Sequence, residues 1–451
     1  MNLELDRGEQ DWQRVAQIVN QQTVTASNVE NRERRSRVRH FVDLGRQNGQ
    51  NLQVRAAQDR RHLGKGIWVR GHYVIRNMQK REKNTKSDGK YYGAKVRIQA
   101  KLLKFSKDGS NPVWIISGVF WMRRILVTGG AGYIGSHMVL RLRDAGETPV
   151  VMDDLSTGNA WLLPDDVPLI EADVGDFEAV SACIREHGIK DVLHFAGSII
   201  VPESVADPLK YYHNNTCISR NLTEACVAGG VENFIFSSTA AVYGLTGDKP
   251  VDETAACAPL SPYGASKLMT EWMLRDVAAT GALRYGVLRY FNVAGADPDL
   301  RTGHCKPEAT HLIKVACQAA LGQRDSVQVY GTDYPTSDGT GVRDYVHVSD
   351  LVDAHALLLE ALRAGGDNAT LNCGYGRGSS VRDVINVMKS VSNSDFAVED
   401  CPRRAGDAAS VVANAAQLRQ RLNWTPRFDD LQTMIEHAYR WECKLHDGNC
   451  G

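Results

Sequence analysis

Two side chains with the spacing of one helical turn carry the strongest chemical signal in this chain of 451 residues. Tyr263 and Lys267 stand four residues apart, so on a helix they lie on the same face. A free tyrosine, whose pKa is about 10, is a poor base at neutral pH. A neighbouring ammonium favours the phenolate and lowers this pKa, which makes the tyrosine usable as a general acid and base. An isolated pair of this kind also occurs by chance on surface helices, so the surrounding sequence decides its meaning.

A glycine-rich turn upstream of the pair supplies that context. The segment Thr128–Gly135 follows a short apolar run and holds glycines at Gly129, Gly132 and Gly135. Glycine allows a tight turn and lets a pyrophosphate approach the N-terminus of the next helix, whose N–H groups favour negative charge. The following strand ends in Asp153, where a carboxylate can bind an adenosine ribose and repel the extra phosphate of NADP. The sequence therefore predicts a site for NAD.

An apolar strand that ends in hydroxyl residues is expected between these two motifs. It runs through Phe234–Phe236 and ends in Ser237, Ser238 and Thr239. Ligands of open α/β sheets lie beyond the carboxyl ends of the strands. We therefore expect Thr239 to bond the reacting hydroxyl and relay its proton to Tyr263. The alternative is that these hydroxyl groups merely cap the strand.

Apolar runs alternate with helical segments around these residues, and their order predicts the architecture. Strands are expected at residues 125–127, 149–152, 191–195, 233–238 and 285–290, and helices at residues 136–145, 212–229 and 264–280. Strands that alternate with helices imply a doubly wound parallel sheet of the Rossmann type. The expected fold class is therefore α/β.

Charge divides the chain into two unequal parts. Residues 1–121 hold 24 Lys and Arg against 11 Asp and Glu, and the remainder holds 29 against 42, so the net charge of zero hides opposite halves. No sustained helical or strand period is visible from residue 10 to residue 107. We expect this basic extension to be poorly ordered or to lie upstream of a natural start at Met122. Nucleic-acid binding is the less favoured alternative, and deleting residues 1–121 would test it.

Composition also excludes several classes of protein. The apolar stretch at residues 113–121 is far shorter than the roughly 20 residues of a membrane helix. The N-terminal residues lack the basic start and apolar core of a secretory signal. Ten cysteines without a C-x-x-C pair or a cluster with histidines argue against a disulfide framework and against a metal site. We therefore expect a cytoplasmic protein that binds no metal and no membrane.

These motifs and five further segments closely resemble the UDP-glucose 4-epimerase family, which belongs to the extended short-chain dehydrogenases/reductases. The further segments are Phe195–Gly197, Arg289–Asn292, Tyr334–Thr336, Gly339–His347 and Arg403–Asp407. The resemblance runs from Met122 to about Leu445 and leaves residues 1–121 unrecognised. It implies a mainly NAD-binding domain at 122–300 and a smaller C-terminal α/β domain at 301–451. The second domain would bind the UDP-sugar and be interleaved with the sheet around residues 340–375, and the protein would form a homodimer.

The resemblance also implies which residues bind the cofactor and the substrate. NAD would be lined by Gly129, Gly132, Tyr133, Ile134, Gly135, Asp153, Asp154, Leu155, Ser156, Thr157, Gly158, Asp173, Val174, Phe195, Ala196, Gly197, Asn214, Lys267 and Phe291. The UDP-sugar would contact Thr239, Tyr263, Asn292, Arg343, Arg404, Asp407 and Val411. The chemistry of these residues is suitable, because arginine pairs with phosphate oxygens and a carboxylate can hold a ribose diol.

Two residues depart from the family pattern. Ile199 stands where many members have a lysine that contacts the cofactor, which bears on how tightly NAD is retained. Val411 stands where some members that accept only unsubstituted hexoses have a tyrosine. A valine leaves more space, so N-acetylated substrates such as UDP-GlcNAc and UDP-GalNAc are also candidates.

The activity that the resemblance implies is the interconversion of UDP-galactose and UDP-glucose. Tyr263, held near Lys267 and relayed by Thr239, would take the proton of the 4-hydroxyl while the C4 hydride passes to NAD. The 4-keto sugar would then turn about its link to UDP and recover the hydride on its opposite face. A 4,6-dehydratase needs acidic residues after the threonine, where this chain has Ala240 and Ala241. A UDP-pentose 4-epimerase stays open, whereas the intact catalytic trio disfavours a mere sensor of NAD or UDP-sugars.

Overall fold

The computed structural model describes residues 51–63, 66–78, 123–245, 247, 249–307, 310–404 and 407–448. The chain divides into two compact units, Met1–Met122 and Arg123–Gly451. Among the residues that the structure describes, no helix combines the length and the apolar character needed to cross a membrane.

The first unit contains a pair of long strands. β1 (Asn51–Leu63) pairs antiparallel with β2 (Gly66–Met78) along their full length. The expectation that this region lacks a strand period was therefore wrong. Ile67, Val69, Tyr73 and Ile75 stand at alternate positions of β2, but Trp68 and Val74 interrupt the alternation, so the signal in the sequence is weak. The other residues of 1–121, with the expectation that they are poorly ordered, lie outside the described residues.

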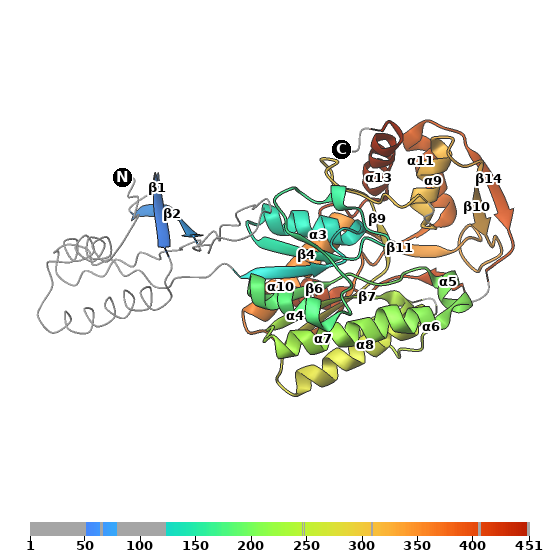
Figure 1. Cartoon of the computed structure of the whole chain (residues 1–451). Coiled ribbons are helices and arrows are strands. Elements are labelled where there is room, and N and C mark those ends of the chain that lie inside the picture. Colours follow the sequence, from blue (N-terminus) through green and yellow to red (C-terminus); the bar gives the residue numbers. More distant parts are fainter. Residues whose placement is uncertain are drawn as a thin grey trace, which may run out of the picture. The chain divides into compact units, whose positions relative to one another are not determined.

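A seven-stranded parallel sheet forms the centre of the second unit (Figure 1). Its strands lie in the order β12-β8-β7-β6-β3-β4-β5, so the winding reverses at β3. The bounds are β3 (Arg124–Thr128), β4 (Thr148–Asp153), β5 (Leu169–Glu171), β6 (Ile189–His194), β7 (Asn233–Thr239), β8 (Arg284–Tyr290) and β12 (Ala369–Cys373). The predicted doubly wound sheet of the Rossmann type is confirmed.

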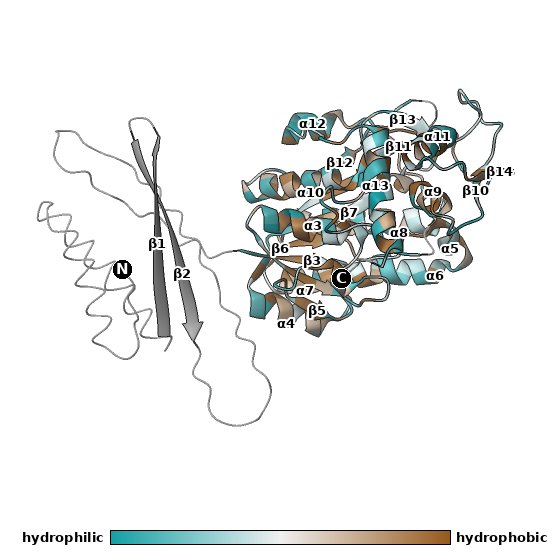
Figure 2. Cartoon of the chain, turned by 90° about the horizontal axis from the view of Figure 1, so that it is seen from above, coloured by the Kyte–Doolittle hydropathy of each residue, from teal (hydrophilic) through white to brown (hydrophobic). Residues whose placement is uncertain are grey.

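Helices cover both faces of this sheet, and alternating side chains explain how. On β3, Ile125 and Val127 pack into the core shared with α3 and α10, whereas Leu126 packs into the core shared with α4, α7 and α8. In Figure 2 the central strands are accordingly apolar, and the helices around them are mixed. The helices are α3 (Tyr133–Asp144), α4 (Phe177–His187), α5 (Val201–Ala206), α6 (Pro208–Tyr211), α7 (Ile218–Ala228), α8 (Pro262–Ala279) and α10 (Val348–Arg363).

The C-terminal half adds two smaller sheets. β11 (Val342–His347) pairs with β13 (Gly378–Ser380), β15 (Ser410–Val411) and β9 (Asn292–Ala294). β10 (Ser326–Tyr330) pairs with β14 (Ala397–Cys401). The remaining helices are α9 (Leu312–Ala320), α11 (Val381–Ser392), α12 (Ala416–Leu422) and α13 (Leu431–His446). The predicted division of this unit into two domains near residue 300 stays a prediction. Although they come after residue 300, α10 packs on the main sheet and β12 is one of its strands.

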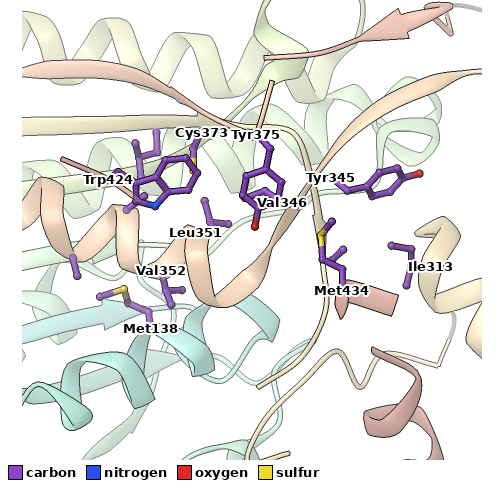
Figure 3. Packing of buried hydrophobic residues seen from close by; sticks show 14 of the residues in the cluster. Met138, Ile313, Tyr345, Val346, Leu351, Val352, Cys373, Tyr375, Trp424 and Met434 are labelled. Carbon is purple, nitrogen blue, oxygen red and sulfur yellow. The ribbon is translucent and has the colours of Figure 1, made fainter. Parts of the chain in front are cut away.

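The helix α10 joins the main sheet to the C-terminal half. Its Val352 belongs to one core cluster with Met138 of α3 and with Trp424 (Figure 3). At its start, Asp350 accepts a hydrogen bond of 2.6 Å from the hydroxyl of Tyr375. Buried apolar side chains such as Val352 and Met138 each stabilise a fold by about 1.5–3 kcal/mol. The sheet and the elements behind the site are therefore held together by shared packing.

Candidate active site

The turn between β3 and α3 is shaped to receive a phosphate group. Gly129 has a φ of +65°, and a Cβ on it would lie 2.6 Å from the backbone nitrogen of Ala196. A Cβ on Gly135 would lie 2.1 Å from the carbonyl oxygen of Gly129. In the described structure α3 starts after Gly132 without a side-chain cap and without an acid in its first turn. Its first N–H groups are therefore available to an anion, as the predicted fit to NAD requires.

Asp153 lies at the carboxyl end of the neighbouring strand β4. It is buried, and it accepts hydrogen bonds from the backbone N–H of Ala131 at 2.9 Å and of Leu155 at 3.0 Å. Burial raises the pKa of this carboxyl, and the two backbone bonds oppose that rise. A Cβ on Gly158 would lie 2.7 Å from Oδ1 of Asp153, so a larger residue there would push this carboxylate aside. Each oxygen keeps a lone pair with which to accept a ribose hydroxyl.

The other predicted cofactor residues gather along the same edge of the sheet. They follow the carboxyl ends of adjacent strands: Tyr133 and Ile134 after β3, Asp154, Leu155, Ser156 and Thr157 after β4, Asp173 and Val174 after β5, and Phe195, Ala196 and Gly197 after β6. Asp154 accepts hydrogen bonds from the backbone and side chain of Ser156, and Asp173 accepts one from Gly175. These short-range bonds fix loops that a nucleotide can contact.

A turn after β6 links the cofactor edge to the catalytic pair. A Cβ on Gly197 would lie 2.8 Å from Oδ1 of Asn215 and 3.5 Å from Nζ of Lys267. Asn214 donates a hydrogen bond of 3.0 Å to the hydroxyl of Ser198, and Asn215 accepts one of 2.8 Å from its N–H. Both asparagines lie in a π-helical stretch, Tyr212–Cys217, which often marks a functional site. Sequence reasoning missed Asn215, and two consecutive asparagines inside a helix were its signal.

The helix α8 positions Tyr263 and Lys267 as predicted. It starts at Pro262, and the hydroxyl of Ser261 caps it by accepting a hydrogen bond of 3.2 Å from Gly264. Both predicted side chains are buried, with 8% of Tyr263 and 3% of Lys267 exposed. The Tyr263 hydroxyl lies close enough to Thr239, at the end of β7, for the threonine hydroxyl to influence its pKa. The spacing on α8 thus brings both groups to one strand end.

The electrostatics of Tyr263 differ from what its spacing to Lys267 led us to expect. Burial raises the pKa of Tyr263, and the nearby Thr239 hydroxyl offsets part of that rise. The expected lowering was wrong for this structure, because the desolvation of the phenol outweighs other effects. Thr239 also accepts a hydrogen bond of 3.1 Å from the N–H of Ala241. It therefore both caps the strand end and contacts the tyrosine.

Lys267 extends from α8 to the end of β7. Its Nζ donates a hydrogen bond of 3.1 Å to the carbonyl of Ser237 and lies 4.9 Å from the centre of the Phe236 ring. Burial lowers its pKa to about 8, and the charge of Glu271 opposes that fall. The ammonium is therefore poised to change charge near neutral pH. Neither Glu271 nor its partner Arg289 was among the predicted site residues.

Besides Thr239 on β7 and Tyr263 on α8, the predicted substrate residues lie on β9, β11, β15 and the loop before β15. Nη2 of Arg343 is 3.6 Å from Oδ1 of Asp407, and Val411 is the strand partner of Arg343. The guanidinium of Arg404 lies over the ring of Tyr330, 3.6 Å from its centre. Phe291 is buried in an apolar cluster against which Val411 packs. The structure thus brings Arg343, Asp407 and Val411 together, while Arg404 rests against β10.

A pocket opens between β9, α9 and α13. It is lined by Tyr133, Asn292, Val293, Ala294, Gly295, His304, His311, Leu312, Ile313, Lys314, Cys317, Tyr345, Ala438, Trp441 and Glu442. Tyr133 comes from the predicted cofactor set and Asn292 from the predicted substrate set. Sequence reasoning missed the N-terminus of α9 as part of this wall, since no spacing in the sequence relates it to either set.

Comparison with known proteins gives this site its context. Residues 125–374 match the model of the NAD dependent epimerase/dehydratase family. A UDP-glucose 4-epimerase of Azospirillum brasilense is 53% identical over 322 residues, which cover 71% of this chain and 92% of that protein. The crystal structure of UDP-glucose 4-epimerase from Brucella ovis in complex with NAD is 41% identical, with a TM-score of 0.69, and covers 70% of this chain and 98% of its own.

A further solved structure extends the comparison. The UDP-Glc/GlcNAc 4-epimerase from Campylobacter jejuni is 44% identical, has a TM-score of 0.63, and covers 71% of this chain and 99% of its own. The family model spans more than half of the chain, and the relatives are matched over nearly all of their length. The resemblance of the motifs is thereby confirmed. The chain belongs to the NAD dependent epimerase/dehydratase family and, within it, to the UDP-glucose 4-epimerases.

Proposed function

We propose that this chain interconverts UDP-galactose and UDP-glucose, with NAD as its cofactor. The observation that carries the proposal is the arrangement of Thr239, Tyr263 and Lys267 at the carboxyl end of β7. This buried set lies beside Gly197 in the turn after β6, which in turn contacts the turn of Gly129, in a chain of the 4-epimerase family. When bound, NAD supplies the group that accepts and returns the hydride of the sugar C4 atom.

The proton of the sugar 4-hydroxyl is handled by Thr239 and Tyr263. Thr239 hydrogen-bonds that hydroxyl, and Tyr263 takes its proton when the sugar is oxidised to a 4-keto form and returns it when the keto group is reduced. Burial raises the pKa of Tyr263, so the phenolate needs a positive neighbour in order to form. The Lys267 ammonium supplies this charge. The sequence of steps leaves no net oxidation.

Inversion requires a firm grip on the nucleotide and a loosely held sugar. Arg343, Arg404 and Asn292 are suited to the diphosphate, and Asp407 is suited to the ribose hydroxyls. Arg343 and Asp407 form an ion pair, so their side chains lie close enough to bind the same ligand, which supports this assignment. A 4-keto sugar that is anchored through UDP can then turn and present its other face.

The geometry of the Gly129 turn and of Asp153 supports their assignment to NAD binding.

The range of substrates depends on Val411. This residue is partly exposed and packs against the cluster of Phe291, where a larger side chain would take up space. The Campylobacter jejuni relative is a UDP-Glc/GlcNAc 4-epimerase. We therefore propose that this chain also interconverts UDP-GalNAc and UDP-GlcNAc.

The assembly and location of the protein are also proposals. Apolar side chains on the outer surface of α7 and α8 are exposed, namely 37% of Val227, 40% of Met269 and 47% of Trp272. We propose that this surface is buried in a homodimer, which light scattering in solution would measure. The described cysteines form no disulfide, which supports a reducing, cytoplasmic location.

The decisive experiment uses the purified full chain and three substrates. UDP-galactose, UDP-GalNAc and UDP-arabinose are incubated separately with the protein, first without and then with added NAD, and the 4-epimers are separated and quantified. We expect conversion of UDP-galactose and UDP-GalNAc. Conversion of none of the three, even with NAD, would exclude the proposed function. Conversion of UDP-arabinose alone would assign a pentose epimerase instead.

A further inference from the structure

A buried carboxylate continues the catalytic face of α8. Glu271 lies four residues after Lys267 and eight after Tyr263, so the three side chains follow one another along the same side of the helix. Glu271 is only 5% exposed. A carboxylate at such a position is costly to desolvate unless other groups compensate for its charge. Its partners therefore show what holds it there.

Three groups from two strands hold the Glu271 carboxylate. Nε of Arg289 on β8 donates to both of its oxygens at 3.1 Å, and Nη2 of Arg289 donates to Oε2 at 2.6 Å. The hydroxyl of Ser238 on β7 donates to Oε1. Arg289 is itself buried and donates a further hydrogen bond of 3.0 Å to the hydroxyl of Tyr243. The carboxylate is thus fixed in place and joins α8 to the strand that carries Thr239.

This fixed carboxylate also acts on Lys267. The Lys267 ammonium lies in a desolvated position, where its charged form is disfavoured, and the charge of Glu271 favours it. Ser237, whose carbonyl accepts the hydrogen bond from Lys267, directly precedes Ser238, which binds Glu271. Both the charge of Lys267 and the position of its Nζ atom therefore depend on the end of β7, through Ser238 and Ser237.

Other titratable groups lie around this centre, and burial shifts the pKa of each of them towards the neutral form. They are His194 on β6, Tyr211 on α6, Tyr243 after β7, Cys257 before α8, Tyr263 on α8 and Tyr290 on β8. Burial lowers the pKa of His194 to about 3, so the ring stays neutral. Burial raises the pKa of the four tyrosines and of Cys257, which favours their neutral forms, and Tyr263 is the one of them from which the proposed mechanism removes a proton. Glu271 is the charged group that acts on Lys267, and Arg289 shares its carboxylate.

We propose that Glu271 is a positioning residue that keeps the Lys267 ammonium charged beside Tyr263, and that Arg289 limits this effect by sharing the carboxylate. The inference rests on the proposed function, because it concerns the charge that Tyr263 needs in order to act as a base. Glu271 itself contacts neither the sugar nor the cofactor in this scheme. Its removal should change the pH dependence of turnover as well as its rate.

Substitutions of Glu271 and of Arg289 should shift the pH dependence of turnover in opposite directions, whereas a purely structural role predicts no such shifts. Turnover should fall as pH rises through the deprotonation of Lys267, because a neutral amine no longer favours the phenolate. Glu271→Gln removes a negative charge and should move this basic limb to lower pH by about one unit or more, a tenfold change in proton affinity. Arg289→Gln removes a positive charge and leaves Glu271 to Lys267 alone, so it should move the limb to higher pH.

The experiment measures kcat/KM for UDP-galactose from pH 5.5 to 10 in the wild-type chain and in four variants. Glu271→Asp and Arg289→Lys keep the charges and should restore the position of the basic limb, even where the rate is lower. Circular dichroism and UDP binding establish that each variant is folded. If Glu271→Gln does not fold, Arg289→Gln and Glu271→Asp still distinguish an electrostatic role of Glu271 from a purely structural one.

The outcomes separate this inference from the proposed function. Opposite shifts of the basic limb in Glu271→Gln and Arg289→Gln, with limbs at the wild-type position in Glu271→Asp and Arg289→Lys, support it. Lower rates in both glutamine variants with an unmoved limb would overturn it and assign Glu271 a structural role. Absence of turnover in the wild-type chain would instead refute the epimerase proposal.

Discussion

The hydroxyl of Tyr263 is the most specific chemical element of the proposed site. Tyr263→Phe removes the group that transfers the proton and keeps the buried ring, so kcat should fall by about 10²–10⁴-fold. UDP binding and NAD content should stay within about twofold, because the ring still fills its place. Turnover of UDP-galactose and calorimetric titration with UDP measure both effects. Retention of more than a tenth of the wild-type kcat would show that another group moves the proton.

Val411 is the residue at which substrate choice can be changed without touching the chemistry. Val411→Tyr introduces a larger side chain next to Arg343 and should exclude the N-acetyl group. We expect kcat/KM for UDP-GalNAc to fall at least tenfold relative to UDP-galactose, as loss of a fitting contact is worth about 1–3 kcal/mol. Val411→Ala is the matched control and should keep both substrates. An unchanged ratio in the tyrosine variant would place the N-acetyl group elsewhere.

Single residues also mark where the sequence was and was not informative. The pairing of Tyr263 with Lys267 could be predicted because helix geometry alone relates positions four apart. The direction of the Tyr263 pKa could not, since burial depends on which elements surround the ring. Arg289 pairs with Glu271 only because β8 lies next to β7 and under α8. No spacing between neighbouring residues in the sequence predicts this ion pair.

The turn after β3 allows a test at the scale of one structural element. Gly129 and Gly188 have nearly the same φ, +65° and +62°, but a Cβ on Gly188 meets nothing within 4 Å. Gly188→Ala should therefore cost only about 1 kcal/mol of folding free energy, from the left-handed backbone alone, and keep NAD bound. Gly129→Ala should also displace the backbone of Ala196 and abolish NAD binding. Urea unfolding and the nucleotide content of the purified protein measure the two variants, and equal behaviour would contradict this account.

Element by element, buried strands were easier to predict than exposed or short ones. The expected strand at residues 285–290 became β8 at Arg284–Tyr290, because its centre, Val287 and Leu288, is apolar and is buried on both faces of the sheet. The three-residue strand β9 exists through its pairing with β11, some fifty residues later. The π-helical turn at Tyr212–Cys217 lies inside an otherwise correctly predicted helix. Such features depend on partners that are distant in sequence.

The whole second unit should lose stability in mild acid. Burial lowers the pKa of His194 to about 3 and of His137 and His355 to about 4. Histidines of the unfolded chain bind protons below about pH 6.5, whereas these folded ones do not, so stability present above pH 6.5 is lost as pH falls towards 4. Each should contribute about 1.4 kcal/mol of destabilisation per pH unit in this window.

Urea unfolding at pH 7, 6 and 5 measures this effect directly. The free energy of unfolding should decrease steadily, and His355→Gln should make the decrease shallower, because it removes one of the three groups from the proton balance. A free energy that stays constant between pH 7 and pH 5 would show that these rings are protonated in the folded state.

The return of β12 to the main sheet has a consequence for how the chain is made. β8 ends at Tyr290, but the strand that pairs with its outer edge, β12, starts only at Ala369. At about 5–20 residues per second, a ribosome needs roughly 4 to 16 seconds to add the residues between them. During that time the nascent cofactor-binding half carries an open strand edge, which is a template for wrong pairing. Chaperones should therefore act on this protein in that interval of synthesis, after β8 has formed and before β12 has left the ribosome.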